Sequence, residues 1–155
     1  MDYRAEIIDT GNPRQKSASI IINAPAEVIF DLLANPAMHA VIDGSKSVQS
    51  VLKAPTRLSL ESRFSMNMKI GVRYRITNLV VEFEEGKVIA WRHLGRWVWR
   101  YELREIAPTQ TLVIESFDAT SSPFQLWLRW RKAYPFVQIA IAKSLVRLKK
   151  YLEER

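Results

Sequence analysis

The side chains best suited to proton transfer in this chain include a histidine and an aspartate four residues apart. His39 precedes Asp43 in a segment that we expect to form a short helical turn. A His–Asp pair at this spacing could polarise a ligand and exchange a proton near neutral pH. The alternative, which we favour, is that Asp43-Gly44-Ser45 forms a turn and that His39 is its exposed neighbour.

The second histidine, His93, lies two residues after Trp91 and therefore on the same face of an expected strand. An imidazole among aromatic rings could donate a proton to a ligand carbonyl or accept one from it. The plainer interpretation, which we favour, is a histidine whose hydrogen bonds are satisfied locally near the end of a strand.

A carboxylate, Glu115, alternates with Val113 and Phe117 on a strand face that we expect to be apolar. A buried carboxylate needs a partner or a shifted pKa, so Glu115 forms either a structural ion pair or a ligand contact. We favour the ion pair. Its candidate partners are Arg73, Arg75 and Arg100.

Several other kinds of site are excluded by composition. The five scattered glycines form no phosphate-binding loop, and the chain has no Gly-x-Ser-x-Gly elbow. Two histidines without any cysteine argue against a protein-ligated transition metal and exclude disulfide bonds. We therefore expect no cofactor and no metal, and the lack of cysteine fits a reducing cytoplasm.

The elements that must position these residues follow from hydrophobic periodicity. A first strand is predicted at residues 17–23, and two short helical segments follow it. An alternating pattern then predicts six more strands, at residues 47–53, 62–75, 76–85, 87–94, 97–106 and 110–119. The long run 62–85 needs a bend, which either Gly71 or Thr77-Asn78 could supply. Apolar residues at helical spacing predict a long helix over residues 137–152, and Pro135 separates it from a short aromatic helix.

This order predicts an α+β helix-grip fold, in which a seven-stranded curved antiparallel sheet wraps around the long C-terminal helix. The 155 residues suit a single domain, with residues 1–16 as a loosely ordered or edge-hugging lead-in. Because a curved sheet and one helix do not fill the space between them, we expect a cavity there.

The concave face of that sheet is predicted to carry an aromatic wall. Alternation places four aromatic side chains on it: Trp91, Trp97, Trp99 and Tyr101. We expect this wall to be shared between helix-packed core and cavity. Met66 and Met68 could add an adaptable apolar wall for a flexible ligand, or could equally be ordinary core.

The net charge of +7 arises from 23 basic and 16 acidic residues without a dense basic block. We expect no nucleic-acid partner, and no stretch is long enough for stable membrane insertion. Residues 124–132 combine Trp with Arg, a composition typical of segments that bind a membrane surface. We favour instead a pocket lid formed by Trp127 and Trp130.

With the elements placed, the chain resembles the START-like (SRPBCC) superfamily, in particular its polyketide cyclase/dehydrase-type branch. The resemblance rests on residues 22–36, 90–93, 99–103, 115–118 and 145–149. Glu61 departs from the pattern, since relatives often have glycine there. The resemblance implies the same fold and a small-molecule cavity, but members include lipid carriers, hormone-binding proteins and cyclases.

Three hypotheses about function follow. The first is a binding protein that holds one small hydrophobic or aromatic molecule between sheet and helix. The second is a polyketide cyclase or dehydratase in which His39, Asp43 or His93 moves protons. The third, which we rank last, is an interaction module that uses its basic surface. Under the first hypothesis, eight residues are expected to contact the ligand: Met66, Met68, Trp91, His93, Trp97, Trp99, Tyr101 and Glu115.

Overall fold

The computed structural model describes residues 3–154 and has the α+β architecture expected from the sequence. A single antiparallel sheet has the order β1-β2-β8-β7-β6-β5-β4-β3. Its strands are β1 (Glu6–Ile8), β2 (Gln15–Ile22), β3 (Val48–Lys53), β4 (Arg63–Ile70), β5 (Val72–Glu84), β6 (Val88–Arg92), β7 (Val98–Ala107) and β8 (Gln110–Asp118). The helices are α1 (Ala26–Leu33), the 3-10 turn η1 (Pro36–Met38), α2 (His39–Ile42), α3 (Gln125–Trp130) and α4 (Ala133–Glu153).

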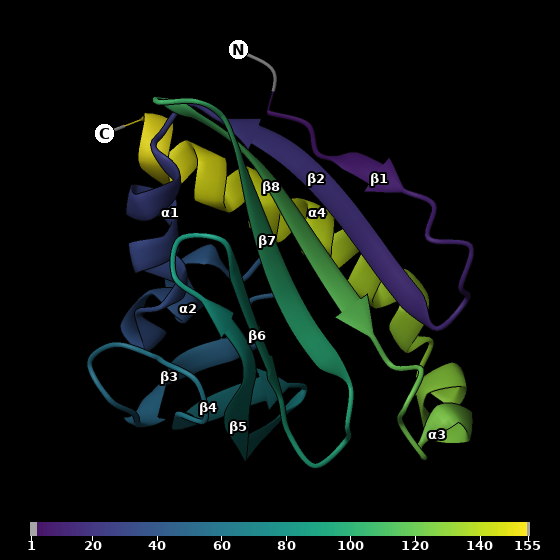
Figure 1. Ribbon diagram of the computed structural model, residues 1–155. Helices are drawn as coiled ribbons and strands as arrows, with labels where there is room; N and C mark the ends of the chain where they lie inside the picture. The colour runs from purple at the N-terminus through teal and green to yellow at the C-terminus, as the bar shows by residue number, and fades with distance from the viewer. Residues whose placement is uncertain (1–2, 155) are drawn as a thin grey trace.

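The sheet curves around α4, as a helix-grip fold requires, and Figure 1 shows α4 crossing behind β2 and β8. It has eight strands rather than the seven expected, because the lead-in contributes β1. This strand adds to the free edge of β2, with Glu6 opposite Ser19. Hydrophobic periodicity could not reveal β1, since an edge strand of three residues is held by backbone hydrogen bonds and buries little.

The boundary between β4 and β5 differs from the expected one. The turn is at Gly71, which has φ of 71°, and Ile70 pairs with Val72 across it. Gly71, one of the two bends expected in this run, is therefore confirmed, whereas the expected strand boundary between residues 75 and 76 is wrong, because β5 continues through that point without interruption. Only glycine adopts this left-handed conformation freely, so a tight reversal at Gly71 is cheaper than one at its neighbours.

The C-terminal helical region is divided close to where Pro135 predicted a division. The left-handed backbone of Lys132, with φ of 53°, separates α3 from α4. Pro135 itself lies in the first turn of α4, where its missing N–H is not needed by the helix. The result is a short aromatic helix followed by a continuous helix of 21 residues.

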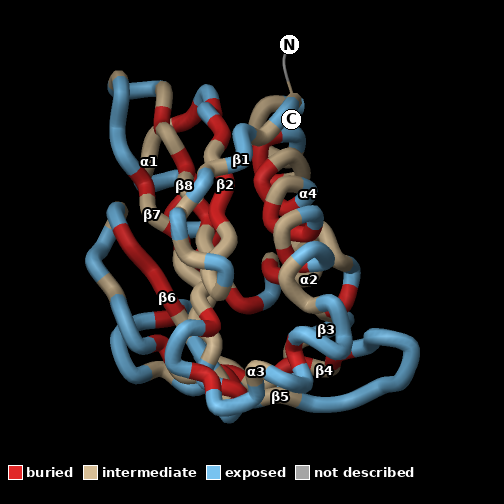
Figure 2. Tube along the Cα trace, turned by 90° about the vertical axis from the view of Figure 1, so that its right-hand side faces the viewer, coloured by how far each residue is buried: buried red, intermediate tan, exposed pale blue. Residues whose placement is uncertain are grey.

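The filled core lies where α1 and the C-terminal half of α4 cover the sheet. Phe30 and Leu33 of α1 are completely buried there, as is Leu145 of α4. Figure 2 shows red, buried stretches along both the sheet and α4. Towards the other end of the molecule, the helix and the sheet enclose the cavity described next.

Candidate functional site

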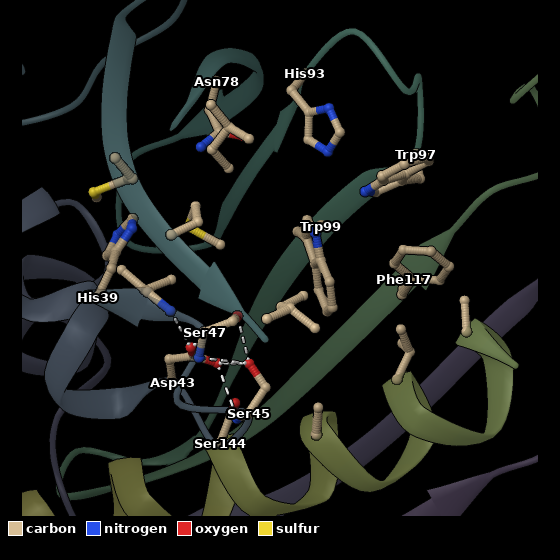
Figure 3. A pocket seen from close by; sticks show the side chains of 18 of the residues that line it. His39, Asp43, Ser45, Ser47, Asn78, His93, Trp97, Trp99, Phe117 and Ser144 are labelled. Atoms are coloured by element: carbon tan, nitrogen blue, oxygen red, sulfur yellow. Dashed lines mark hydrogen bonds between the residues drawn. The ribbon is translucent and has the colours of Figure 1, made fainter. Parts of the chain in front are cut away.

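A cavity of about 620 Å³ lies between the concave face of the sheet and the N-terminal half of α4. Figure 3 shows aromatic and sulfur-containing side chains from the strands facing it, opposite α4. The side of α4 that borders the cavity carries mostly small or medium-sized residues, which are Ala133, Val137, Ala140 and Ser144, together with the half-exposed Phe136. Short side chains over most of this side of the helix therefore help to leave the space open.

The aromatic wall lies where alternation placed it. All four of its members line the cavity: Trp91, Trp97, Trp99 and Tyr101. Trp91 and Trp99 are register partners on β6 and β7, and the ring of Trp99 lies 4.9 Å from that of Phe117. Met66 and Met68 on β4 are buried and border the same space. The structure thus brings these six side chains together around one volume.

His39 is buried against this wall, so its expected exposure is wrong. Its ring stacks on Trp91 with centroids 4.8 Å apart, and Phe64 contacts it edge-on. Nε2 lies 2.8 Å from the carbonyl oxygen of Leu33. Because a carbonyl only accepts, Nε2 carries the hydrogen, and Nδ1 of the neutral ring is an acceptor.

The electrostatic setting of His39 favours that neutral ring. Burial lowers the pKa of His39, and the Leu33 carbonyl and the charge of Asp43 oppose this shift only in part. Among the described residues, Nδ1 has no hydrogen-bond partner, and the side chain lines the cavity. His39 can therefore accept a hydrogen bond, or a proton, from a molecule in the cavity.

Asp43 is bonded to its own turn instead of to the ring of His39. Its carboxylate accepts hydrogen bonds from the Ser45 hydroxyl at 2.7 Å, the Val48 N–H at 2.8 Å, the Ser45 N–H and the Ser47 hydroxyl. Figure 3 shows this network beside the cavity. It is the turn chemistry that Asp-Gly-Ser predicted, and it makes Asp43 a fixed negative charge at the cavity wall.

Gly44 fastens this turn to the long helix. Its N–H donates to the Ser144 hydroxyl at 2.8 Å. A Cβ at position 44 would overlap the backbone of α4 at Ala140 and Ser144, so only glycine permits this approach. The turn and α4 consequently form one rigid edge of the cavity.

Glu115 and Tyr101 form a buried polar pair on neighbouring strands. The Tyr101 hydroxyl donates to Oε1 of Glu115 at 2.9 Å, and Oε2 has no partner among the described residues. Burial raises the pKa of Glu115 well above its usual range. The Tyr101 hydrogen bond opposes this shift, and the charge of Asp43 adds to it. Glu115 is thereby held towards its neutral form at the cavity wall.

The expected ion pair of Glu115 with an arginine is wrong. Arg100 is on the opposite face of β7, where its guanidinium contacts Glu82 at 2.8 Å and Glu102 at 3.0 Å. Arg73 and Arg75 are exposed on β5. Alternation along single strands could not decide which arginine shares a face with Glu115, since that depends on register.

His93 follows the end of β6 and lines the cavity. Its Nδ1 accepts a hydrogen bond from the Gly95 N–H at 3.1 Å, and its ring meets Trp97 edge-on. Partial burial lowers the pKa of His93. Local hydrogen bonding of His93 was the interpretation favoured from the sequence, and the bond to Gly95 agrees with it. Nε2 has no such bond among the described residues and can contact a ligand.

Two kinds of cavity residue were missed by sequence reasoning. Asn78 on β5 is buried at the cavity, and its amide has no hydrogen-bond partner among the described residues. An asparagine between Ile76 and Val80 on one strand face was a usable signal. The small residues of α4 gave a weaker signal, because alanine is common in helices whether they face a core, a cavity or solvent.

Of the two tryptophans expected to form a pocket lid, only Trp127 borders the cavity. Trp127 lines the cavity and stacks on Trp97, with centroids 6.2 Å apart and an interplanar angle of 8°. Trp130, on the same helix α3, does not reach the cavity and is exposed. In the described part of the chain, no helix is long and apolar enough to cross a bilayer.

Comparison with known proteins places this architecture in a family. Residues 14–153 match the family described as polyketide cyclase / dehydrase and lipid transport. The uncharacterised protein Rv0088 of Mycobacterium tuberculosis is 37% identical over 113 residues, which cover 72% of this chain and 50% of that protein. The chain thus spans about half the length of the curated relatives it matches.

Solved structures show the same fold at low sequence identity. Protein Ms6760 from Mycobacterium smegmatis superposes with a TM-score of 0.72 at 13% identity, covering 97% of this chain and 98% of that one. The ZhuI aromatase/cyclase from Streptomyces sp. R1128 superposes with a TM-score of 0.65 at 13% identity, covering 90% of this chain and 96% of that one. On the family match over nearly its whole length, this chain belongs to the polyketide cyclase/dehydrase and lipid-transport family.

Proposed function

We propose that the protein binds one small hydrophobic or aromatic molecule in the cavity between the sheet and α4. The observation that carries this proposal is the cavity itself, of about 620 Å³, with an aromatic wall and two methionines around it. This volume lies within the range of roughly 300–1,000 Å³ typical of small-molecule sites. The cavity also counts against the interaction-module hypothesis, which a filled interior would have favoured.

A few polar groups at fixed positions give the cavity a means of orienting its ligand. His39 offers the acceptor Nδ1, which suits a ligand hydroxyl. In its neutral form, which burial favours, Glu115 offers an O–H donor that suits a carbonyl oxygen, and the Asn78 amide can both donate and accept. A ring system bearing hydroxyl and carbonyl groups fits this inventory better than a plain hydrocarbon does.

The comparisons support the proposal at the level of the family. The family description includes both lipid transport and polyketide cyclisation, so its members handle largely apolar molecules. The similarity to an aromatase/cyclase extends to the fold at 13% identity. Binding is common to both activities, which is why we rank it first.

The test is a titration of the protein with a naphthalene-based fluorescent probe. Trp91, Trp97 and Trp99 line the cavity, so an occupying probe should quench tryptophan emission and saturate at one molecule per chain at sub-millimolar concentration. An unchanged emission spectrum over the whole titration would remove the binding proposal.

A cyclase or dehydratase is the second candidate, and His39 is the observation that favours it. Its Nδ1 could take a proton from a carbon between two ligand carbonyls, leaving an enolate whose carbon attacks a further carbonyl of the same molecule. The alkoxide formed in that step would then take a proton from an acid such as Glu115. Turnover of a polyketone that stops in a His39→Ala variant would favour this activity over simple binding.

A further inference from the structure

The end of the molecule where the cavity opens carries an unusual amount of exposed apolar surface. Among the described residues, the four most exposed large hydrophobic side chains are Leu94 (93%), Leu126 (83%), Trp130 (76%) and Val72 (73%). They belong to three segments, at residues 69–73, 93–97 and 124–136. We call these three segments together the mouth surface.

The three segments of the mouth surface meet around one opening. Val72, Trp97 and Trp127, one from each segment, line the same cavity. Trp127 stacks on Trp97, which joins α3 to the loop between β6 and β7. Figure 2 shows α3 at the same end of the molecule as β4 and β5. The four most exposed apolar side chains therefore all belong to segments that border the cavity, although other large hydrophobic residues, such as Leu60 and Ile106, are exposed elsewhere.

The charge of the mouth surface has one sign. Its segments contain six basic residues and no aspartate or glutamate, and the basic residues are Lys69, Arg73, Arg96, Arg129, Arg131 and Lys132. In the described part of the chain, none of the six forms an ion pair. Elsewhere, some exposed cations, such as Arg57 and Lys87, lie against carboxylates, whereas Arg63, for example, forms no ion pair among the described residues.

A lid function accounts for Trp127 but not for its neighbours. Leu126 and Trp130 are four residues apart on α3 and so share a face of the helix. Both are strongly exposed, and neither lines the cavity. Apolar surface displayed in this way costs free energy in water unless something covers it.

We propose that the mouth surface docks the protein on an anionic phospholipid bilayer, with the cavity opening towards the membrane. Aliphatic and tryptophan side chains suit the boundary between acyl chains and headgroups, and a ring of unpaired cations suits anionic headgroups. Nucleic acid fits less well, because Leu94, Leu126 and Val72 offer no hydrogen bonds to bases. If the proposed binding function also holds, an apolar ligand can pass between bilayer and cavity with little exposure to water.

The test is co-sedimentation of the whole protein with lipid vesicles. No ligand is added, so the result does not depend on whether the cavity binds one. Vesicles of phosphatidylcholine mixed with phosphatidylserine should bind the protein, and vesicles of phosphatidylcholine alone should bind it at least tenfold more weakly. Binding should also weaken as salt is raised. Equal binding to both vesicles, or none to either, would overturn the proposal.

Two pairs of matched variants locate the effect on the mouth surface. Leu126→Ser combined with Trp130→Ser should weaken vesicle binding at least tenfold, whereas Leu60→Ser with Ile106→Ser, exposed elsewhere, should not. Arg129→Glu combined with Lys132→Glu should also weaken vesicle binding at least tenfold. Its control is Arg63→Glu combined with Lys87→Glu, which changes the charge equally and should leave binding unchanged. Losses of equal size in test and control variants would mean general charge or stability effects and would overturn the assignment. So would tighter binding to single-stranded nucleic acid than to the anionic vesicles.

Discussion

The two halves of α4 cover the same sheet, yet one half closes a solid core and the other borders a cavity. The C-terminal half presents Leu145 and Leu148, which are buried completely or nearly so. The N-terminal half presents Ala133, Ala140 and Ser144 to the space in front of the aromatic wall. The backbone of the helix is continuous across both halves. The change from filled core to cavity thus coincides with a change from large to mostly small side chains on α4.

The largest effect should come from truncation in the filled half. Leu145→Ala removes a completely buried side chain from a close-packed core, so we expect it to lower the free energy of unfolding by about 3 kcal/mol. Val137→Ala, next to existing empty space, should cost only about 1 kcal/mol. Urea denaturation of both variants measures the contrast. Equal losses would mean that the two halves are packed alike.

Gly44→Ala tests the fastening of the turn to the hollow half. The added methyl overlaps the backbone of α4, so we expect a loss of about 2 kcal/mol in the free energy of unfolding. Ser144→Ala is the control, since it removes only the hydrogen bond to the Gly44 N–H and should cost about 1 kcal/mol. A Gly44→Ala protein as stable as wild type would show that the turn is not held against the helix.

Glu115→Gln should change how stability depends on pH. The pKa of Glu115 in the folded protein is raised above the unfolded value of 4.5, so its stabilising effect is fully present below pH 4.5. That effect is lost as the pH rises from there through the folded pKa, at up to about 1.4 kcal/mol per pH unit. The glutamine variant lacks this loss, and its stability relative to wild type should increase between pH 5 and pH 8. A difference that is constant over this range would contradict the burial argument.

The histidines should give the smallest effects if the protein only binds its ligand. His39→Ala and His93→Ala should each change affinity for a cavity ligand by about 1 kcal/mol, the net value of one hydrogen bond. A catalytic role would instead reduce turnover of a polyketone roughly 100-fold while binding persisted. Parallel binding and turnover measurements on both variants separate these outcomes.

Local pattern was enough to predict most of the fold. Alternation placed Trp91, Trp99 and Tyr101 on one face, and helical spacing predicted the long C-terminal helix. Gly71 was one of two bends expected between residues 62 and 85, and alternation alone could not choose between it and Thr77-Asn78, so the strand boundary was placed too late. Local signals specify an element well, but they specify its exact ends poorly.

The site was harder to predict because its contacts cross between elements. The ring of His39 is oriented by the backbone carbonyl of Leu33, and no side-chain pattern reveals that contact. The partner of Glu115 proved to be Tyr101 on the neighbouring strand, which depends on sheet register. Glu61 adopts φ of 67°, a left-handed conformation in which glycine is unstrained, and the residue type itself gives no sign of it.

Native mass spectrometry of three proteins tests most directly whether the hollow half of α4 is a binding site. Wild type, Ala140→Leu and Ala142→Leu would each be incubated with the naphthalene-based probe. Ala140 lines the cavity and Ala142 does not, so the two substitutions add the same volume in different places. We expect one bound probe on wild type and Ala142→Leu, and a strong loss of binding on Ala140→Leu. Equal binding by all three proteins, or no binding by any of them, would contradict the account.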